Sequence, residues 1–456
     1  MKKILFTRLC IVITAILTVN VAFSQSAIDY RRSSLSFILI EDDGLGDSRD
    51  MVVEAYSSNE FPNQYNNHLL KDSKFVSEEV KPTIEDCLAS GWYKDTLRST
   101  KDFLVALKKP LNSLRYTKAD SSEALLEPNK KEMLQIKMDK FIRDQNLAKQ
   151  VVASWFNRDA STGNMDWDLI KERGKYSASE EKLDQAKSVA DETSFLMDFE
   201  LIGNTYTVFN KMEFYANEPV ARLLAEAGKA EVMESMAGKP QILLDKALEG
   251  IEKIYEKTKE GYTVKCNSFL YQLDWDETIA ERTKQTFFPD GESIDLKAAW
   301  DTTNLYNLSF VGKTTVASIV TFKIGETRTE EQIIDLQVKR TMDNAIAKLQ
   351  KKYIQFRPVA PVSSVEPLTA RIGMKQGVEK KQKWEILEMS INELGLPEWK
   401  SIGKSSVDKK APIWDNTQGA EVQTDEAGQP LEVIEFTTFA GGKNAQPGLH
   451  FIRLIK

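Results

Sequence analysis

The chain has 456 residues, of which 41% are hydrophobic and 28% are charged, with 61 basic and 68 acidic side chains. This length predicts two or three packed domains, and the mildly acidic balance argues against binding to nucleic acids or to anionic membranes. A catalytic triad needs one histidine and most zinc enzymes need two or three, so the presence of only His68 and His450 weakens these enzyme classes. Both histidines are expected to be structural rather than catalytic.

Residues 1–24 are predicted to be a signal peptide. Three basic side chains in the first eight residues precede a 13-residue apolar run from Leu9 to Val21, and Ala22 and Ser24 suit the −3 and −1 positions of a cleavage site. The run is shorter than the roughly 20 residues that span a bilayer; an uncleaved membrane anchor is the alternative. Cleavage would leave 58 basic and 68 acidic residues, a net charge of −10.

Residues 27–358 are expected to form an α/β domain. A buried strand from Leu35 to Ile40 opens it, and a long helix is predicted over 127–156 because apolar residues recur there with helical spacing. Alternating or β-branched segments predict further strands, and a charged stretch predicts a further helix. These strands cover 199–215, 261–275 and 305–324, and the further helix covers 177–192.

A helical hairpin is predicted as an insertion in this domain at 217–260. Asn217 and Pro219 are typical of a helix start, and Gly238 and Pro240 break the apolar pattern between two helices. The hairpin would connect two of the predicted strands.

The clearest helix is predicted over 327–356, with Thr327 and Glu330 as its capping box. Its apolar residues step by three or four, which predicts that one side of the helix packs against the sheet. A membrane-surface or coiled-coil helix is the alternative. The apolar stripe consists of Ile334, Val338, Met342, Ala345, Leu349 and Tyr353.

Residues 357–367 hold three prolines and two serines, and they are predicted to be a domain boundary. Short strands separated by Gly, Pro and Asn follow, which predicts a small closed β-barrel over 366–456. The expected fold class is therefore α+β: a sheet with packed helices and a helical-hairpin insertion, followed by a small C-terminal β-barrel.

Gly312-Lys313-Thr314 matches the end of a phosphate-binding loop, which would place a nucleotide there. The first glycine of that motif should stand at the position of Asn307, and the segment after the motif is β-branched, so no helix N-terminus is expected to bind a phosphate. We therefore predict a hairpin turn at Gly312 and Lys313 between two strands, and no bound nucleotide.

Two Asp-Trp-Asp triplets, at 166–168 and 274–276, are the candidate catalytic carboxylates. Paired acids beside an indole ring suit a glycosidase, with one acid protonated and the ring stacked on a sugar. In a chain with 68 acidic residues such triplets also arise by chance, and the favoured interpretation is a solvated edge with a buried tryptophan. The hydrolase alternative depends on Asp274 and Asp276.

The sequence predicts no metal site and no cofactor. Acidic loops at 42–47 and 157–168 carry oxygen ligands, but neither has the ligand spacing and final glutamate of a calcium-binding loop, so both are expected to be solvated turns. Cys87 and Cys266 remain after removal of the leader, and an exported chain could join them in a disulfide. A buried free thiol in a strand explains Cys266 equally well.

The order of predicted strands and helices resembles the periplasmic α/β domain of curli-assembly and flagellar-assembly lipoproteins. The segment 372–387 is similar to the opening hairpin of SH3-like barrels appended to such domains, with Gly373, Gly377 and Trp384 at comparable spacing. The chain departs from that group in lacking a lipid-attachment cysteine and in carrying the insertion at 217–260, so pore formation is not implied. The resemblance implies a role in envelope assembly or binding, and it assigns no catalytic or ligand-binding residues.

These observations favour an exported protein, periplasmic or extracellular in a Gram-negative-type cell. We expect it to be non-enzymatic and to bind or scaffold other envelope components, either proteins or glycans. The alternative is a carboxylate-dependent hydrolase that acts on glycans. No second apolar stretch is long enough to span a membrane.

Overall fold

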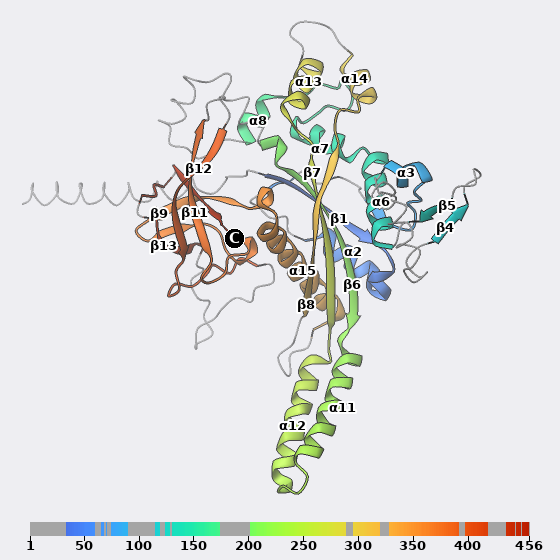
Figure 1. Cartoon of the computed structure of the whole chain (residues 1–456), viewed down its shortest axis with the longest axis vertical. Coiled ribbons are helices and arrows are strands. Elements are labelled where there is room, and N and C mark those ends of the chain that lie inside the picture. The colour runs from blue at the N-terminus through green and yellow to red at the C-terminus, as the bar shows by residue number, and fades with distance from the viewer. Residues whose placement is uncertain are drawn as a thin grey trace, which may run out of the picture.

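The computed structural model combines a mixed sheet covered by helices, a closed six-stranded barrel and a projecting pair of helices (Figure 1). The predicted α+β class, with a sheet, packed helices and a β-barrel, is therefore confirmed. The structure describes residues 33–59, 65–67, 70, 74–89, 115–118, 124–127, 130–173, 201–288, 295–319, 328–391, 397–417, 435–442, 444–447 and 449–455.

The sheet joins a parallel half to an antiparallel half. Its strands follow the order β2-β1-β6-β7-β8, with β3 also paired to β1; β1 runs parallel to β2, β3 and β6, whereas β6, β7 and β8 alternate in direction. The strands are β1 (Ser33–Glu41), β2 (Tyr65–Asn67), β3 (Phe75–Val76), β6 (Thr205–Ala216), β7 (Tyr262–Leu273) and β8 (Leu308–Ile319).

Helix α15 (Glu330–Lys352) covers one face of the sheet together with α2 (Arg49–Ser57). The predicted stripe does pack against strands: Ile334, Val338 and Met342 contact the buried residues Met212 and Cys266. The predicted capping box was displaced by two residues, because Thr329 and Gln332 form it instead. Glu330 is already the first helical residue, and Thr327 lies outside the described residues.

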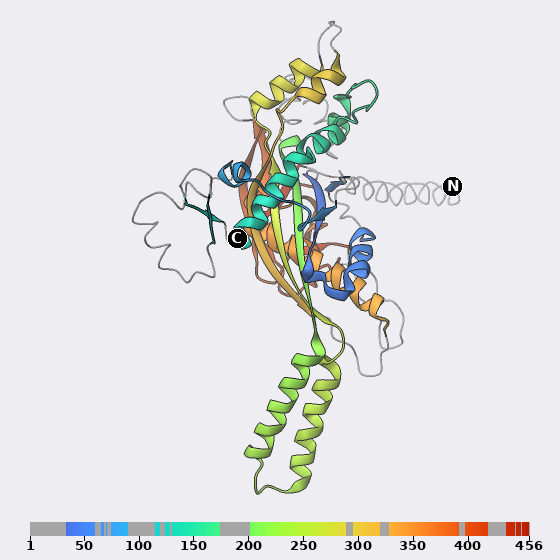
Figure 2. The same cartoon turned by 90° about the vertical axis from the view of Figure 1, so that its right-hand side faces the viewer.

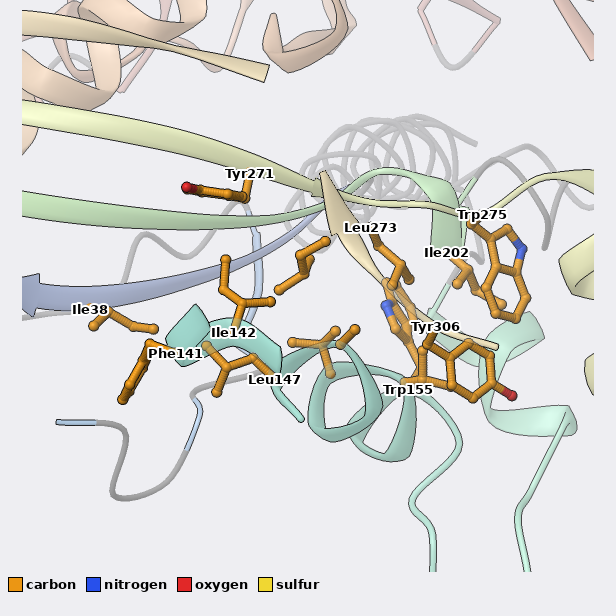
Figure 3. Packing of buried hydrophobic residues seen from close by; sticks show 14 of the residues in the cluster. Ile38, Phe141, Ile142, Leu147, Trp155, Ile202, Tyr271, Leu273, Trp275 and Tyr306 are labelled. Atoms are coloured by element: carbon orange, nitrogen blue, oxygen red, sulfur yellow. The ribbon is translucent and has the colours of Figure 1, made fainter. Parts of the chain in front are cut away.

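Helices α6 (Lys130–Asp144) and α7 (Leu147–Trp155) cover part of the opposite face (Figure 3). A single long helix was predicted here, and this is wrong, because the chain breaks at Asn146, which has a left-handed backbone with φ of 51°. Asparagine adopts that conformation more readily than most residues. The break lets both helices place their apolar side chains, among them Phe141, Leu147 and Trp155, against the sheet.

The segment around Gly312 is one strand with a bulge, and the predicted hairpin turn is wrong. In β8 the pairing shifts from Leu270–Gly312 to Tyr271–Phe310, which leaves Val311 as the extra residue. Phe310 packs on the α7 side of the sheet and Val311 on the α15 side. Gly312 is required here for space, because a Cβ atom at this position would lie 2.6 Å from Cε1 of Tyr353.

We expect Gly312→Ala to lower the free energy of unfolding by about 1–3 kcal/mol, because the added methyl group overlaps the Tyr353 ring. Urea denaturation measures this loss. Combining it with Tyr353→Ala should cost less than the sum of the two single changes, since the clash is then absent. Strict additivity would show that the ring does not set the requirement for glycine.

The last strand of the sheet has hydrogen-bond acceptors that are already engaged. Lys348 Nζ donates to the Thr315 carbonyl at 2.6 Å, and Lys352 Nζ donates to the Lys313 carbonyl at 2.8 Å. The Tyr353 hydroxyl donates to the same Lys313 carbonyl at 2.9 Å. Side chains at the C-terminal end of α15 therefore bind the backbone of β8, which is the outermost strand among the described residues.

The closed barrel has the strand order β10-β13-β12-β11-β14-β9. Its interior is apolar and contains the fully buried Trp384, whose ring lies 5.5 Å from that of Phe439. The strands are β9 (Val359–Val365), β10 (Leu368–Ala370), β11 (Lys383–Ile391), β12 (Pro397–Val407), β13 (Thr437–Gly441) and β14 (His450–Leu454).

The proline-rich segment predicted as a boundary belongs to this barrel. Strand β9 pairs with both β10 and β14, so the barrel begins at Val359, before the expected start at residue 366. Of the three prolines only Pro361 lies within β9, where it lacks one backbone donor while the other residues of the strand complete the pairing. Only a few residues separate α15 from the barrel.

The barrel docks against the C-terminal half of α15. Lys375 in the barrel lies 3.5 Å from Asp343 of α15, and both side chains are buried. Arg357 donates to the carbonyls of Leu454 and Ile455 at 3.3 and 2.8 Å. These contacts join the barrel to the sheet through charged as well as apolar groups.

The remaining described elements lie at the periphery. Helix α13 begins after an N-cap at Asp276, whose carboxylate accepts a hydrogen bond from the Ile279 amide at 2.8 Å. The helix predicted over 177–192 and His68 lie outside the described residues. The elements are α3 (Ile84–Ala89), β4 (Arg115–Lys118), β5 (Ala124–Glu127), α8 (Asp168–Arg173), α13 (Glu277–Phe287) and α14 (Leu296–Thr302).

A candidate docking surface on the helical arm

The feature most suited to binding is the pair of helices between β6 and β7, which we call the helical arm. Helix α11 (Asn217–Ser235) continues directly from β6, and α12 (Gln241–Thr258) returns to β7. The helix start at Asn217 and the break at Gly238 to Pro240 confirm the predicted hairpin. Figures 1 and 2 both show the arm leaving one end of the sheet and standing clear of the barrel and of the other helices.

The two helices of the arm are held together by a narrow apolar seam. On α11 the seam residues are small, and on α12 they are large, so the helices pack closely: an added Cβ on Gly228 would lie 3.5 Å from Ile251. The seam repeats with steps of four, three and four on both helices, as in a coiled coil. It consists of Ala221, Ala225, Gly228 and Val232 facing Leu244, Leu248, Ile251 and Tyr255.

Polar contacts fix the arm to the sheet and brace it along its length. At the base, Asn217 Nδ2 donates to the Glu260 carbonyl at 3.0 Å, and Thr263 Oγ1 donates to Asn217 Oδ1 at 2.7 Å. Farther out, Lys229 pairs with Glu252 at 2.5 Å. The base of the arm is therefore a defined junction with the sheet.

A second register, apolar except for Glu231, runs along the outside of the arm. On both helices it stands one residue before the seam, and it repeats with the same steps of four, three and four. Its large members are open to solvent, with Leu224 68% and Ile254 64% exposed, and a Cβ added to Gly250 would meet no atom within 4 Å. We call it the arm face: Val220, Leu224, Ala227 and Glu231 on α11, and Leu243, Ala247, Gly250 and Ile254 on α12.

Both halves of the arm face lie on the same side of the arm. One residue corresponds to a rotation of about 100° around a helix. Because α11 and α12 run in opposite directions with their seams facing each other, an equal rotation from the seam turns both registers to one side. The arm thus presents a two-helix apolar surface of the kind that a four-helix bundle buries.

Three of the four predicted carboxylates accept local hydrogen bonds. Asp276 caps α13, and Asp166 accepts a hydrogen bond from the Asp168 amide at 3.0 Å. Asp274 Oδ2 accepts from Asn307 Nδ2 at 2.8 Å and from Ser309 Oγ at 2.7 Å. The strand edge expected for the triplets is not found, because the first lies in a turn that enters α8 and the second lies between β7 and α13.

The structure does bring the two triplets together through their tryptophans. The ring of Phe156 lies 5.1 Å from that of Trp167 and 6.4 Å from that of Trp275. Trp275 is buried and Trp167 is partly buried in the same apolar core (Figure 3 shows Trp275). The expected burial is confirmed for Trp275 and is only partial for Trp167, and both rings pack in this core.

The two acidic loops form turns. Asp42 accepts a hydrogen bond from the Gly44 amide at 3.0 Å, and its carboxylate pairs with Lys211. Hydrogen bonds from Ser161 and Thr162 lower the pKa of Asp159. No group of three or more His, Cys, Asp or Glu side chains among the described residues is arranged to hold a metal ion.

Cys87 and Cys266 are both buried and are not joined in a disulfide, so the disulfide alternative is wrong. Burial raises the pKa of the Cys266 thiol to about 12, which keeps this group protonated and chemically inert. His450 is also buried, and its Nδ1 atom accepts a hydrogen bond from the Gln446 amide at 2.9 Å. The expectation that His450 is structural agrees with this contact.

The barrel carries a shallow pocket of about 340 Å³. Its lining comes from β11, β12 and the segment after β13, with Lys404 and Asn444 as its polar side chains. Ile386 forms part of its wall, and a Cβ atom on Gly442 would clash with Ile386. It lacks the convergent polar groups that orient a small ligand. The arm face is the stronger candidate for binding.

No protein-family model matches the chain, and a comparison with curated proteins finds no relative. None of the helices in the described ranges has the length and apolar character needed to cross a membrane.

Proposed function

We propose that this chain is an exported, non-enzymatic protein of the cell envelope that binds or scaffolds other envelope components through its helical arm. The observation that carries the proposal is the arm face, a two-helix apolar surface whose large residues are more than half exposed at Val220, Leu224 and Ile254. Monomeric proteins rarely leave a contiguous apolar surface open unless it binds something.

Other features support the proposal. The leader at 1–24 and the acidic composition suit a soluble chain in the periplasm or outside the cell. We regard the barrel as SH3-like and the whole chain as similar in plan to envelope-assembly proteins, with the arm as its own addition. In this view the sheet and the barrel form a rigid base, and the arm holds the binding surface away from that base.

An arm-deleted variant tests this function. Ala216 and Tyr262 are paired residues of the β6–β7 ladder, so residues 217–261 can be replaced by an Asn-Gly turn that joins the strands directly. We expect this variant to be exported and folded, with a free energy of unfolding within about 1 kcal/mol of the parent, because α12 has no buried residue and the buried residues of α11 are only Asn217, Ala221 and Ala225. Envelope proteins crosslinked to the parent in intact cells should be lost.

Two further results would count against the proposal. Recovery of the same crosslinked envelope components with the arm-deleted variant would show that the arm is not the binding element. A soluble cytosolic form that retains residues 1–24 would remove the exported setting.

A variant carrying Met233→Glu and Ile242→Glu, which changes exposed apolar residues outside the arm face, is the matched control and should keep its partners.

A further inference from the structure

We infer that the arm face binds the arm face of a second copy of this chain, so that two arms form a parallel four-helix bundle. The inference rests on the arm being the docking element proposed above. It identifies the partner of the arm, and the evidence is the charge and geometry of the arm itself.

Contacts across the seam show which residues of α11 and α12 lie at the same height along the arm. Gly228 stands beside Ile251, and Lys229 pairs with Glu252. Because both helices rise by the same amount per residue, equal steps from this contact reach equal heights. Leu224 therefore stands level with Tyr255, next to Ile254, and Lys246 stands level with Met233.

The arrangement of apolar residues is self-complementary. If a two-fold axis runs parallel to the arm, α11 of one copy lies over α12 of the other at the same level. Leu224 then meets Ile254 of the other copy. Nearer the middle, Ala227 stands close to Gly250 of the other copy, and these small residues let the helices approach closely.

Charges near the tip select this orientation. Glu231 lies on the arm face and Glu234 at its rim on α11, and both are exposed. Lys246 is also exposed, and it stands two residues before the seam residue Leu248, so it points away from α11 of its own hairpin. In the parallel pair this lysine lies at the outer rim, beside α11 of the other copy, at a level between Glu231 and Glu234. With the arms in opposite directions, α11 would lie over α11, and the lysine would not reach these acids.

A membrane surface fits the arm less well. Residues 217–258 carry six basic and eight acidic side chains, whereas helices that lie on anionic bilayers have lysine- and arginine-rich polar faces.

The size of the arm face also sets the expected affinity of the dimer. Helix α12 is about 27 Å long, and two helices are about 20 Å wide, so a pair would bury about 1,000 Å² in total. That area lies at the low end for specific complexes, so the dimer should form in the micromolar range.

Sedimentation velocity of the mature full-length chain at increasing concentration tests the inference. We expect a monomer–dimer equilibrium that Leu224→Glu with Ile254→Glu abolishes. The control pair Met233→Glu with Ile242→Glu should leave the dimer intact, because those exposed residues lie outside the arm face. Circular dichroism checks that each variant is folded.

Charge exchange tests the orientation. We test two variants, Glu231→Lys with Glu234→Lys, and separately Lys246→Glu. Each should weaken dimerisation on the order of tenfold at low salt, because the groups at positions 231, 234 and 246 that meet between the two copies then carry the same charge. An equimolar mixture of these two variants should form a heterodimer with about the parent affinity. High salt should reduce all of these differences.

Several results would overturn the inference. The parent chain could remain a monomer at every concentration. The control variant Met233→Glu with Ile242→Glu could lose the dimer as fully as the arm-face variant does. The mixture of the two charge variants could fail to recover the parent affinity. Flotation of a monomeric parent with phosphatidylglycerol-containing vesicles, lost on Leu224→Glu with Ile254→Glu, would identify lipid as the occupant instead. A monomer that still loses its envelope crosslinks on arm deletion would leave the proposed function standing and show that self-pairing is wrong.

Discussion

Replacing Trp155 with alanine is expected to lower the free energy of unfolding by about 3–5 kcal/mol, one of the two largest losses expected from a single substitution. The side chain is fully buried between α7 and the sheet, and its Nε1 atom donates to Thr205 Oγ1 at 2.6 Å. Removal of the indole therefore leaves a cavity and also breaks a buried hydrogen bond. Urea denaturation followed by far-UV circular dichroism measures the loss.

A conservative change separates these two contributions. Trp155→Phe keeps much of the ring but cannot donate, and Thr205 Oγ1 still donates to the Ile202 carbonyl at 2.6 Å. We expect this variant to lose only about 1–2 kcal/mol. Ile319→Ala, at a residue that is 59% exposed, is the control and should change stability by less than about 0.5 kcal/mol. Equal losses in all three variants would contradict the assigned role of Trp155.

Replacing Asp343 with alanine is expected to cost about 3–5 kcal/mol, because it leaves the buried ammonium group of Lys375 without its carboxylate. The pair lies where the barrel meets α15, so the loss should appear first as separation of the barrel. Chymotrypsin cleavage at Phe356, which is buried next to this junction, reports that separation.

A double substitution tests whether the charge pair itself is responsible. Asp343→Leu with Lys375→Met replaces both buried charges by apolar groups, and it should recover most of the stability that the single change loses. Recovery would assign the loss to an uncompensated charge. If the double variant is as unstable as Asp343→Ala, the destabilisation comes from packing rather than from the ion pair.

Regular periodicity made several elements predictable from the sequence. The stripe from Ile334 to Leu349 identified the buried side of α15, and Gly238 with Pro240 located the break between α11 and α12. In both cases a local signal coincided with the final packing. The capping box was displaced because Thr327-x-x-Glu330 and Thr329-x-x-Gln332 both fit the pattern, and periodicity alone does not choose between them.

Other elements were set by partners far away in the sequence. Gly312 suggested a turn, yet its role is to admit the Tyr353 ring from the end of α15. The prolines of 357–367 suggested a boundary, yet β9 finds pairing partners in β10 and β14. Local composition contains no information about these contacts, so tertiary structure overrode the propensity of the residues.

The arm face was missed for a different reason. Its signal is present in the sequence as two interleaved registers with the same steps, one beginning at Ala221 and the other at Val220 on α11. A helix with two apolar registers is equally consistent with full burial in a core. Only the fold shows that the hairpin extends away from every other element, so that one register remains open (Figure 2).

The contacts of Lys348 and Lys352 with the backbone of β8 bear on how this protein associates. A polypeptide folds among crowded neighbours, and an unguarded edge strand can pair with further chains into open-ended fibrils. On β8, the oxygens of Lys313 and Thr315 are already engaged by a helix of the same molecule. Growth by strand addition at this edge is thereby discouraged.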